Sequence, residues 1–543
     1  MRSKRLPLAF LAITMVCGHA VASGPRDPFL DEVQHRAFLF FWRETDPVTG
    51  VTKDRANAFK PDTYDIGSIA ATGFALAALP IGVERHWISR EEGHNRAMLT
   101  LEFFEKRAPR IHGVFPHFLK FGTGERAWEC EYSTIDTTLL LAGAITAGQY
   151  FGGDVKAASA RLYNDVDWKY WSPRGFVCMG SRPQDAEFLG SDYNGYSEAL
   201  LLYVVAIGSP THPVPAGLWD KLGRWVARYR QYSTIAGSSL FVNQYQNLFV
   251  DFRGKSDGHA DYWEVAKTNT LANRQFCIDQ APMFPGYGPD VWGLTAGDGP
   301  GGYDAFSAEP GGANHDGTIN PHAAGGSFMF TPAESRRALR TMLDKYRDHI
   351  WGRYGFSDGF NVGKGWWASD VVGIDTGATL LSIENQRTGL VQRLFMKNPA
   401  ARTAMRRIGF KPVFKGPAPS IKIAEAAMLE PGVSLKTAFR LPAKPRAWLR
   451  SDLILYGGVV EERSVRISLN GRPIGSASAP KGVAYAAALR IPEASLRWGK
   501  ANTVTVTLEP SPKGSATYGP ILIGPKDAID AQPLVVRLAP ATP

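Results

Sequence analysis

Two carboxylic acids in this chain stand at the beginning of segments that are predicted to form buried helices. Glu198 directly precedes the apolar run ALLLYVVAI, and Asp375 begins a stretch dominated by Ile, Leu, Gly, Ala and Thr. A helix that is small and apolar nearly all round is buried, so its polar end must face a cavity. Burial beside Tyr193 and Tyr196 would raise the pKa of Glu198, as a general acid requires. With Asp375 as a general base, the pair could hydrolyse a glycosidic bond.

Both carboxylates also have a simpler interpretation. Acidic residues are common in the first turn of a helix, where they accept hydrogen bonds from free N–H groups and face the positive end of the helix dipole. Asp136, three residues after Ser133, has the same two interpretations. A capping residue at the mouth of a cavity would still face a substrate, so the two roles are compatible.

Aromatic residues near the carboxylates favour a carbohydrate as the ligand. Trp366 and Trp367 lie shortly before Asp375, and sugar rings stack on aromatic faces. The Gly- and Pro-rich stretch over residues 286–317 is expected to be a lid or a binding loop, because long loops in compact domains are usually functional. Its Trp292 and Tyr303 are expected to line a subsite.

Further polar residues are expected to contact substrate or to support the catalytic pair. The carboxylates in this group lie at or near the same kind of helix: Asp65, Glu131, Asp136 and Glu384. Glu384 could instead pair with Arg387 on the same helix face. Arg55 could donate hydrogen bonds to sugar hydroxyls, or only balance the charge of Asp54. The acidic residues of the 286–317 loop lack EF-hand spacing, and we expect neither a metal ion nor an organic cofactor.

The elements that must position these side chains alternate between two kinds of helix from Pro28 to Phe410. One kind is amphipathic and charged, and is predicted over residues 27–44, 89–108, 155–166, 216–232, 260–281 and 332–347. The other kind is small and apolar, and is predicted to begin near Asp65, Ser133, Asn194, Gln244, Asn320 and Ile374. Six buried helices that alternate with six half-exposed ones predict an (α/α)6 toroid, in a mainly α-helical catalytic domain over residues 23–410.

Helical periodicity disappears after Phe410. Residues 411–420 are Pro-rich and typical of a linker, and short alternating runs separated by turns such as Asn470-Gly471 follow. They predict an antiparallel β-sandwich over residues 421–543. The stretches at 465–479 and 489–510 resemble galactose-binding-like jelly rolls. We expect a structural or carbohydrate-binding accessory domain without chemistry of its own.

Four segments resemble the signature of a known family: residues 68–92, 131–145, 193–214 and 351–399. The family is the glycoamylase-like family of bacterial glycoside hydrolases, whose characterised relatives are β-1,2-glucanases. The resemblance implies an (α/α)6 toroid and hydrolysis of β-1,2-glucan with inversion at the anomeric carbon. It also places Glu198 at the position of the family's general acid, and Asp375 is the natural general base. Endo cleavage and release of sophorose from a chain end both remain open.

The N-terminus and the overall charge bear on location and partners. Residues 1–22 combine basic side chains, a short apolar run and Ala20-Val21-Ala22, which is typical of a secretory signal peptide. We therefore expect an exported monomer, periplasmic or extracellular, without a membrane span. The net charge is +10, but the basic residues are scattered, which argues against nucleic-acid binding. Three cysteines remain after the signal peptide, so at most one disulfide can form.

Two other functions fit parts of the same pattern. A polysaccharide lyase acting on an acidic glycan would use a Tyr/His pair, for which Tyr193, Tyr196 and His315 are available. A glycan-binding protein without activity is the second alternative, although the presence of both Glu198 and Asp375 argues against it.

Overall fold

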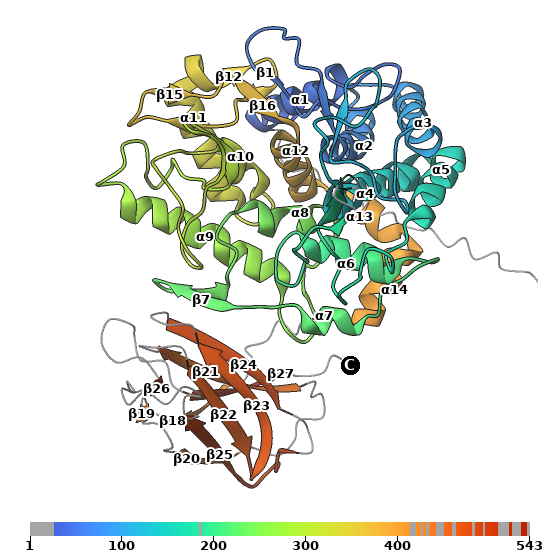
Figure 1. The fold of residues 1–543 in the computed structure, drawn as a ribbon. Coiled ribbons are helices and arrows are strands. Elements are labelled where there is room, and N and C mark those ends of the chain that lie inside the picture. The colour runs from blue at the N-terminus through green and yellow to red at the C-terminus, as the bar shows by residue number, and fades with distance from the viewer. Residues whose placement is uncertain are drawn as a thin grey trace, which may run out of the picture.

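The computed structural model describes residues 27–182, 184 and 187–412, and then the segments 420–424, 427–429, 434–440, 450–458, 463–479, 484–491, 495–508, 521–523 and 534–539. The expected signal peptide and most of the expected linker lie outside these residues. Helices predominate up to residue 410, and strands follow (Figure 1). No helix in the described ranges is long and apolar enough to cross a membrane.

Six of the helices are buried along most of their length. They are α2 (Ile69–Glu84), α4 (Thr134–Phe151), α6 (Ala199–Gly208), α8 (Phe241–Phe249), α10 (Pro321–Gly326) and α12 (Gly373–Arg387). Each packs against the next one in this order, and α12 packs against α2, so that the contacts close a ring (Figure 1). Each predicted start lies within about one and a half turns of the observed one. Ser133 accepts a hydrogen bond from the backbone of Asp136, as expected of a cap.

The helices of the ring run in the same direction, which brings their N-termini to one end. Gly73 of α2 lies against Leu139 of α4, and Gly377 of α12 lies against Phe74 of α2. Each of these residues is in the second turn of its helix, so the helices begin at the same level. Gly325 and Gly326 of α10 lie against Thr379 of α12 and Gln244 of α8, and Tyr196, just before α6, donates a hydrogen bond to Asn243 of α8. Side chains at the starts of the six helices therefore face one common opening.

Amphipathic helices cover the outside of the ring at five of the six predicted places. They are α1 (Pro28–Arg43), α3 (Arg90–Lys106), α5 (Gly153–Asp165), α9 (Tyr262–Gln280) and α11 (Pro332–Ile350). The prediction of a helix over residues 216–232 is wrong. There α7 (Gly217–Lys221) is short, and β7 (Val226–Tyr229) and β8 (Tyr232–Ile235) form a hairpin. Their sequence, VARYRQYSTI, is rich in aromatic and β-branched residues, which favour strands.

The end of the helical region fills the place of the missing outer helix. After α13 (Leu390–Lys397), α14 (Pro399–Ile408) packs against α6. The ring of Phe410 then packs against Trp219, Phe252 and Tyr262, with centroid distances of 5.7, 5.3 and 6.1 Å. The next two residues form β17 (Lys411–Pro412), which pairs with β9 (Lys255–Ser256). The chain therefore leaves the helical region along its outer wall.

Short antiparallel strands lie at the end of the ring where the six helices begin. β2 (Ile66–Ser68), β4 (Tyr132–Ser133) and β16 (Asp370–Val372) lead directly into α2, α4 and α12. β2 pairs with β3 (Phe118–Lys120), β4 with β5 (Gly180–Arg182), β5 with β6 (Glu187–Phe188), and β16 with β1 (Arg55–Asn57). Further hairpins are formed by β10 (Ala296–Gly299) and β11 (Gly302–Ala305), β12 (Trp351–Gly352) and β13 (Gly355–Phe356), and β14 (Phe360–Asn361) and β15 (Trp366–Trp367). We call this set of strands and their turns the rim.

The described segments after residue 420 form two antiparallel sheets. One contains β18 (Ser420–Ala424), β27 (Leu534–Ala539), β21 (Arg450–Gly458), β26 (Ile521–Ile523) and β19 (Ala427–Leu429) in this order, and β24 (Ala484–Ile491) pairs with β21. The other has the order β20 (Ser434–Arg440), β25 (Ala501–Leu508), β22 (Arg463–Leu469), β23 (Arg472–Ala479). The predicted turn at Asn470-Gly471 joins β22 and β23, and both residues have positive φ, as a tight hairpin turn requires.

The three cysteines in the described ranges are buried free thiols: Cys130, Cys178 and Cys277. Burial raises the pKa of Cys178 to about 11 and that of Cys277 to about 12. A thiol that stays protonated is a poor nucleophile, so these two cysteines are packing residues.

The closest approach in the ring yields a stability prediction. A Cβ added at Gly143 of α4 would lie 1.9 Å from the carbonyl oxygen of Gly73 in α2, and backbone atoms cannot move away as a flexible side chain can. We expect Gly143→Ala to lower the free energy of unfolding by about 1–3 kcal/mol. Gly217→Ala is the matched control, because no atom lies within 4 Å of the added methyl group. Equal Tm values for the two variants in thermal unfolding would contradict the close packing of α2 and α4.

Candidate active site

Asp375 lies in the first turn of α12 and is 2% exposed. Its Oδ1 accepts a hydrogen bond from the hydroxyl of Tyr245 at 3.4 Å and lies 3.4 Å from Nε2 of His322. Its Oδ2 is buried and has no hydrogen-bond partner among the described residues. Burial, and then the neighbouring Asp358 carboxylate, raise the pKa of Asp375 well above its ordinary value. The contacts of the Asp375 carboxylate go to α8 and α10, and no backbone N–H of α12 donates to it, so its interpretation as a helix cap is not supported.

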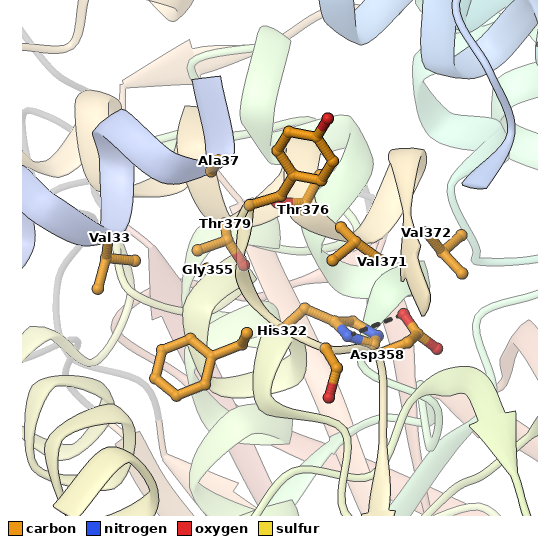
Figure 2. Close-up of a pocket in the computed structure, with 12 residues that line it drawn as sticks. Val33, Ala37, His322, Gly355, Asp358, Val371, Val372, Thr376 and Thr379 are labelled. Carbon is orange, nitrogen blue, oxygen red and sulfur yellow. Dashed lines mark ion pairs between the residues drawn. The ribbon is translucent and has the colours of Figure 1, made fainter. Parts of the chain in front are cut away.

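His322 connects Asp375 to a second buried carboxylate. Its Nδ1 lies 3.4 Å from Oδ1 of Asp358, and its Nε2 also lies 3.3 Å from the carbonyl oxygen of Ala296. Burial lowers the pKa of His322 to about 4, so the imidazole is neutral at neutral pH. Figure 2 shows His322 and Asp358 side by side at the edge of a small pocket. The pocket is lined from α1 and α12 as well, by Val33, Ala37, Thr376 and Thr379.

An arginine balances part of the negative charge around Asp375. Arg55 donates from Nη1 to both oxygens of Asp298, at 3.0 and 3.1 Å, and from Nε to Asp54 at 3.1 Å. The β1–β16 pairing sets Arg55 opposite Val372, three residues before Asp375. Burial and the nearby Asp358 raise the pKa of Asp298 to about 6. Several carboxylates thus share one guanidinium, which keeps the local potential negative.

Glu198 occupies the N-cap position of α6 and is half-buried. Its Oε2 is buried and has no hydrogen-bond partner in the part of the chain that the structure describes. Burial raises the pKa of Glu198 to about 7, and the negative charge of Asp136 adds to this effect. Burial, and then the charge of Glu198, raise the pKa of the Tyr193 hydroxyl, so this tyrosine lies within electrostatic reach of Glu198. A carboxylic acid with a pKa near 7 can donate a proton at neutral pH.

A second histidine lies between two carboxylates on the Glu198 side of the opening. Nδ1 of His117 lies 2.9 Å from Oε1 of Glu131, and Nε2 lies 3.6 Å from Oδ1 of Asp136. Burial alone would lower the pKa of His117, but the two carboxylates outweigh it and raise that pKa to about 9. The imidazolium therefore neutralises much of the charge next to Glu198. The hydroxyl of Ser133 holds Asp136 in place with a hydrogen bond of 2.5 Å.

Two tyrosines lie within electrostatic reach of the carboxylates. Tyr245 of α8 is buried, and both Asp375 and Glu198 contribute to the rise in its pKa, after the larger effect of burial. Tyr245 is therefore within electrostatic reach of both acids. Tyr303 of β11 is 48% exposed, and the charges of Asp375 and Asp358 act on its hydroxyl. The structure thus places Tyr303 at the mouth of the site, near Asp375.

Each of the two histidine groups has a donor set that a divalent cation accepts. In both groups, however, the two ring nitrogens already face the carboxylates of the group.

Several residues predicted for the site lie elsewhere. Glu384 is at the last turn of α12, where it accepts hydrogen bonds from Arg85 at 2.8 Å and Gln34 at 3.1 Å. It anchors the far end of the ring, and its expected pairing with Arg387 is replaced by these contacts. Trp292 is 0% exposed and belongs to a hydrophobic cluster, so it cannot line a subsite in this conformation.

The remaining aromatic and acidic candidates lie on the rim or beside it. Trp366 and Trp367 form β15, and Trp367 stacks on His349 at 4.4 Å rather than presenting a free face. Asp65 is exposed just before β2. Tyr196 donates a hydrogen bond to Asn243 at 2.8 Å, which fixes the segment before Glu198.

Sequence reasoning missed four residues at the heart of the site: His117, Tyr245, His322 and Asp358. Tyr245 and His322 each lie in a predicted apolar helix, and a polar side chain near the start of such a helix was an available signal. His117 and Asp358 lie on rim loops, and only the pairing of the strands brings them to the opening.

Comparisons with known proteins show which family the chain resembles. The Glycoamylase family model matches residues 190–399, which include Glu198, His322, Asp358 and Asp375. An exo-β-1,2-glucooligosaccharide sophorohydrolase (non-reducing end) from Parabacteroides distasonis is 27% identical over 423 residues. The match covers 70% of this chain and 58% of the relative, so the chain spans less than two thirds of that curated relative's length.

Two solved structures extend the comparison. The endo-β-1,2-glucanase from Chitinophaga pinensis, in its complex with sophorotriose and glucose, is 30% identical, with a TM-score of 0.66 over 71% of this chain and 98% of that chain. The β-1,2-glucanase from Parabacteroides distasonis is 26% identical, with a TM-score of 0.64 over 70% of this chain and 59% of that chain.

The buried charge of Asp375 predicts a pH-dependent effect on stability. A carboxyl group whose pKa is raised in the folded state destabilises the fold as the pH rises above the ordinary value of 3.8, because ionisation is harder there than in the unfolded chain. We therefore expect Asp375→Asn to raise Tm by about 2–4 °C near pH 8 and by less near pH 4. The exposed Asp348→Asn in α11 should leave Tm unchanged at both values. A rise in Tm of the same size at both pH values would contradict this explanation, because the ionised form of Asp375 would then not be the source of the instability.

Proposed function

Because the chain belongs to the Glycoamylase family, we propose that it is a glycoside hydrolase that cleaves β-1,2-glucan with inversion at the anomeric carbon. The observation that carries the proposal is the pair of carboxyl groups at the starts of α6 and α12. Each has a buried oxygen without a partner among the described residues, and each has a raised pKa. The relatives named as β-1,2-glucanases supply the substrate class.

The two carboxyl groups lie at the starts of helices on opposite sides of the ring. α6 and α12 are three places apart in a ring of six, so their first turns lie on opposite sides, with Tyr245 within reach of both. An inverting glycosidase needs this arrangement, because a water molecule must fit between the base and the sugar. We assign Glu198 as the general acid that protonates the glycosidic oxygen, and Asp375 as the general base that takes a proton from the attacking water.

The surroundings suit each residue to its role. Glu198 keeps its proton up to a pH of about 7, since burial and Asp136 disfavour its ionised form. His117 limits that effect by neutralising Asp136 and Glu131. Asp375 must be ionised to act, and its raised pKa makes it a stronger base than an exposed aspartate. The hydrogen bond from Tyr245 and the contact with His322 leave Oδ2 of Asp375 as the oxygen for water.

The architecture and location are part of the same proposal. Residues 23–410 are assigned to an (α/α)6 toroid, which the closed ring of helix contacts supports. Residues 421–543 are assigned to a β-sandwich of the jelly-roll type, supported by the two antiparallel sheets. The basic and apolar N-terminal segment over residues 1–22 supports export to the periplasm or beyond.

The structure separates the histidine from the tyrosines that were named for the lyase alternative. His315 packs against Phe276 and Phe284 at 4.9 and 4.7 Å, in a hydrophobic cluster distinct from the one that contacts Tyr193 and Tyr196. A Tyr/His pair of these residues is therefore not assembled.

A panel of linear and cyclic β-glucans tests the substrate class. Chromatography of the products would show mixed lengths for endo cleavage and sophorose alone for release from a chain end, and an ultraviolet-absorbing product would restore the lyase alternative.

Substitution of the two acids tests their roles. We expect Glu198→Gln and Asp375→Asn each to lower kcat on β-1,2-glucan by about 10²–10⁴-fold, because each variant keeps the shape of the side chain but cannot exchange the required proton. Glu105→Gln on the outer helix α3 is the control and should keep the kcat of the unmodified protein. A Glu198 or Asp375 variant that kept more than about a tenth of the activity would move its role to Asp136 or Glu131.

The stereochemistry of the first product tests the two assignments together. If a water molecule attacks on the ring face opposite the leaving group, cleavage of a β-linkage must give the α-anomer first. Proton NMR in the first minutes of hydrolysis can detect the anomer before mutarotation. An initial β-anomer would show that a carboxylate attacks carbon directly, and would overturn inversion even if β-1,2-glucan were the substrate.

A further inference from the structure

Trp128 is the most exposed tryptophan side chain that the structure describes at the rim, with 63% of its surface accessible. It lies in the loop between β3, which pairs with β2 at the start of α2, and β4, which leads into α4. An indole in this position buries little apolar surface, so the fold gains little from it. The stability of the fold therefore does not explain why position 128 carries a tryptophan.

The backbone that carries Trp128 is in a costly conformation. Trp128 has φ +52° and Glu129 has φ +48°, and both are in the left-handed region that side chains with a Cβ rarely adopt. Two consecutive residues of this kind require about 1–3 kcal/mol each, which other contacts must supply. Strain of this kind is concentrated at sites that bind ligands.

Hydrogen bonds from neighbouring side chains hold the turn in this conformation. Arg126 donates to the carbonyl oxygen of Cys130 at 2.6 Å and to that of Glu129 at 2.7 Å. Gln184, from the loop between β5 and β6, donates to the same Glu129 carbonyl at 3.1 Å and accepts from Arg126 at 3.0 Å. The guanidinium of Arg126 also lies over the ring of Tyr132. The indole is therefore presented by a fixed backbone.

A chain of ring contacts connects Trp128 with the acid side of the site. The indole meets Phe118 edge-on at 5.2 Å, and Phe118 stacks on His117 at 3.8 Å with an angle of 14° between the rings. His117 in turn contacts Glu131 and Asp136, the carboxylate that acts on Glu198. Trp128 thus stands at the outer end of a surface that leads to the general acid.

We propose that Trp128 forms a binding subsite for a glucosyl unit of the glucan chain, at the rim on the Glu198 side and away from the bond that is cleaved. The C–H face of a pyranose ring stacks on an open indole face. The subsite rests on the proposed function, because it assumes that a β-glucan enters the opening. It holds a longer chain in place and takes no part in proton transfer.

The subsite predicts a defect that depends on substrate length. In the full-length protein, Trp128→Ala should raise KM about tenfold for long β-1,2-glucan, equivalent to about 1.4 kcal/mol of binding free energy, and leave kcat nearly unchanged. KM for the shortest oligosaccharide that is cleaved should not change, because it does not reach the rim. Trp128→Phe should keep most of the affinity. Trp225→Ala removes another exposed tryptophan and should behave as the unmodified protein.

A binding measurement and a stability measurement complete the test. In the Glu198→Gln background, titration with long β-1,2-glucan should change tryptophan fluorescence, and Trp128→Phe should abolish most of that change. Trp128→Gly should weaken binding without lowering Tm, because glycine accepts the positive φ. A lower Tm together with the loss of binding would assign Trp128 a structural role and overturn the subsite. An unchanged KM with Trp128→Ala would also overturn it, whereas absence of any β-glucan turnover by the unmodified protein would overturn the proposed function instead.

Discussion

The direct contact of backbones inside the ring of helices is the constraint on which the site depends. Gly73 and Gly143 let α2 and α4 touch, and Gly377 makes room for Phe74 between α2 and α12. Larger side chains at these places would push the helices apart and widen the ring. Because the ring is narrow, the first turns of its helices converge, and the acids at those turns lose water. The chemistry assigned to Glu198 and Asp375 is therefore a result of how small the residues behind them are.

The two sides of the opening handle their negative charge in different ways. On the Asp375 side, burial of several carboxylates around one arginine leaves excess charge, and the neutral His322 cannot compensate for it. On the Glu198 side, His117 carries a positive charge between two carboxylates. The first environment makes a carboxylate more basic, and the second limits the repulsion that acts on a carboxylic acid. Two residues of similar chemistry thus become suited to opposite directions of proton transfer.

Local sequence was sufficient for the helices and for the carboxylates at their starts. The runs after Glu198 and Asp375 are apolar nearly all round and have no polar face to expose to solvent, so their composition predicted their burial. It was not sufficient for the segment at 216–232, whose amphipathic pattern fits a helix but whose aromatic and β-branched residues form β7 and β8. The pattern could not reveal that α14 takes the vacant place, because that contact joins residues about two hundred positions apart.

The supporting residues of the site were harder to predict for the same reason. His117 and Asp358 have no helical pattern around them, and their neighbours come from distant strands. Trp292 and Tyr303 come from one loop and have similar chemistry, yet one is in the core and the other is at the opening. Composition predicted aromatic residues at the site, but it could not predict which of the two rings would be buried in the core and which would be exposed at the opening.

The way the chain leaves the helical region has a practical consequence for dissecting the protein. Phe410 covers the rings of Trp219, Phe252 and Tyr262, and Lys411–Pro412 adds a strand to β9. A chain cut at the last turn of α14 would therefore expose an aromatic surface and an unpaired strand edge, and both promote aggregation. The helical region is therefore best separated from the strands that follow by a cut after Pro412. An isolated helical region has to retain Phe410, Lys411 and Pro412 to avoid aggregation.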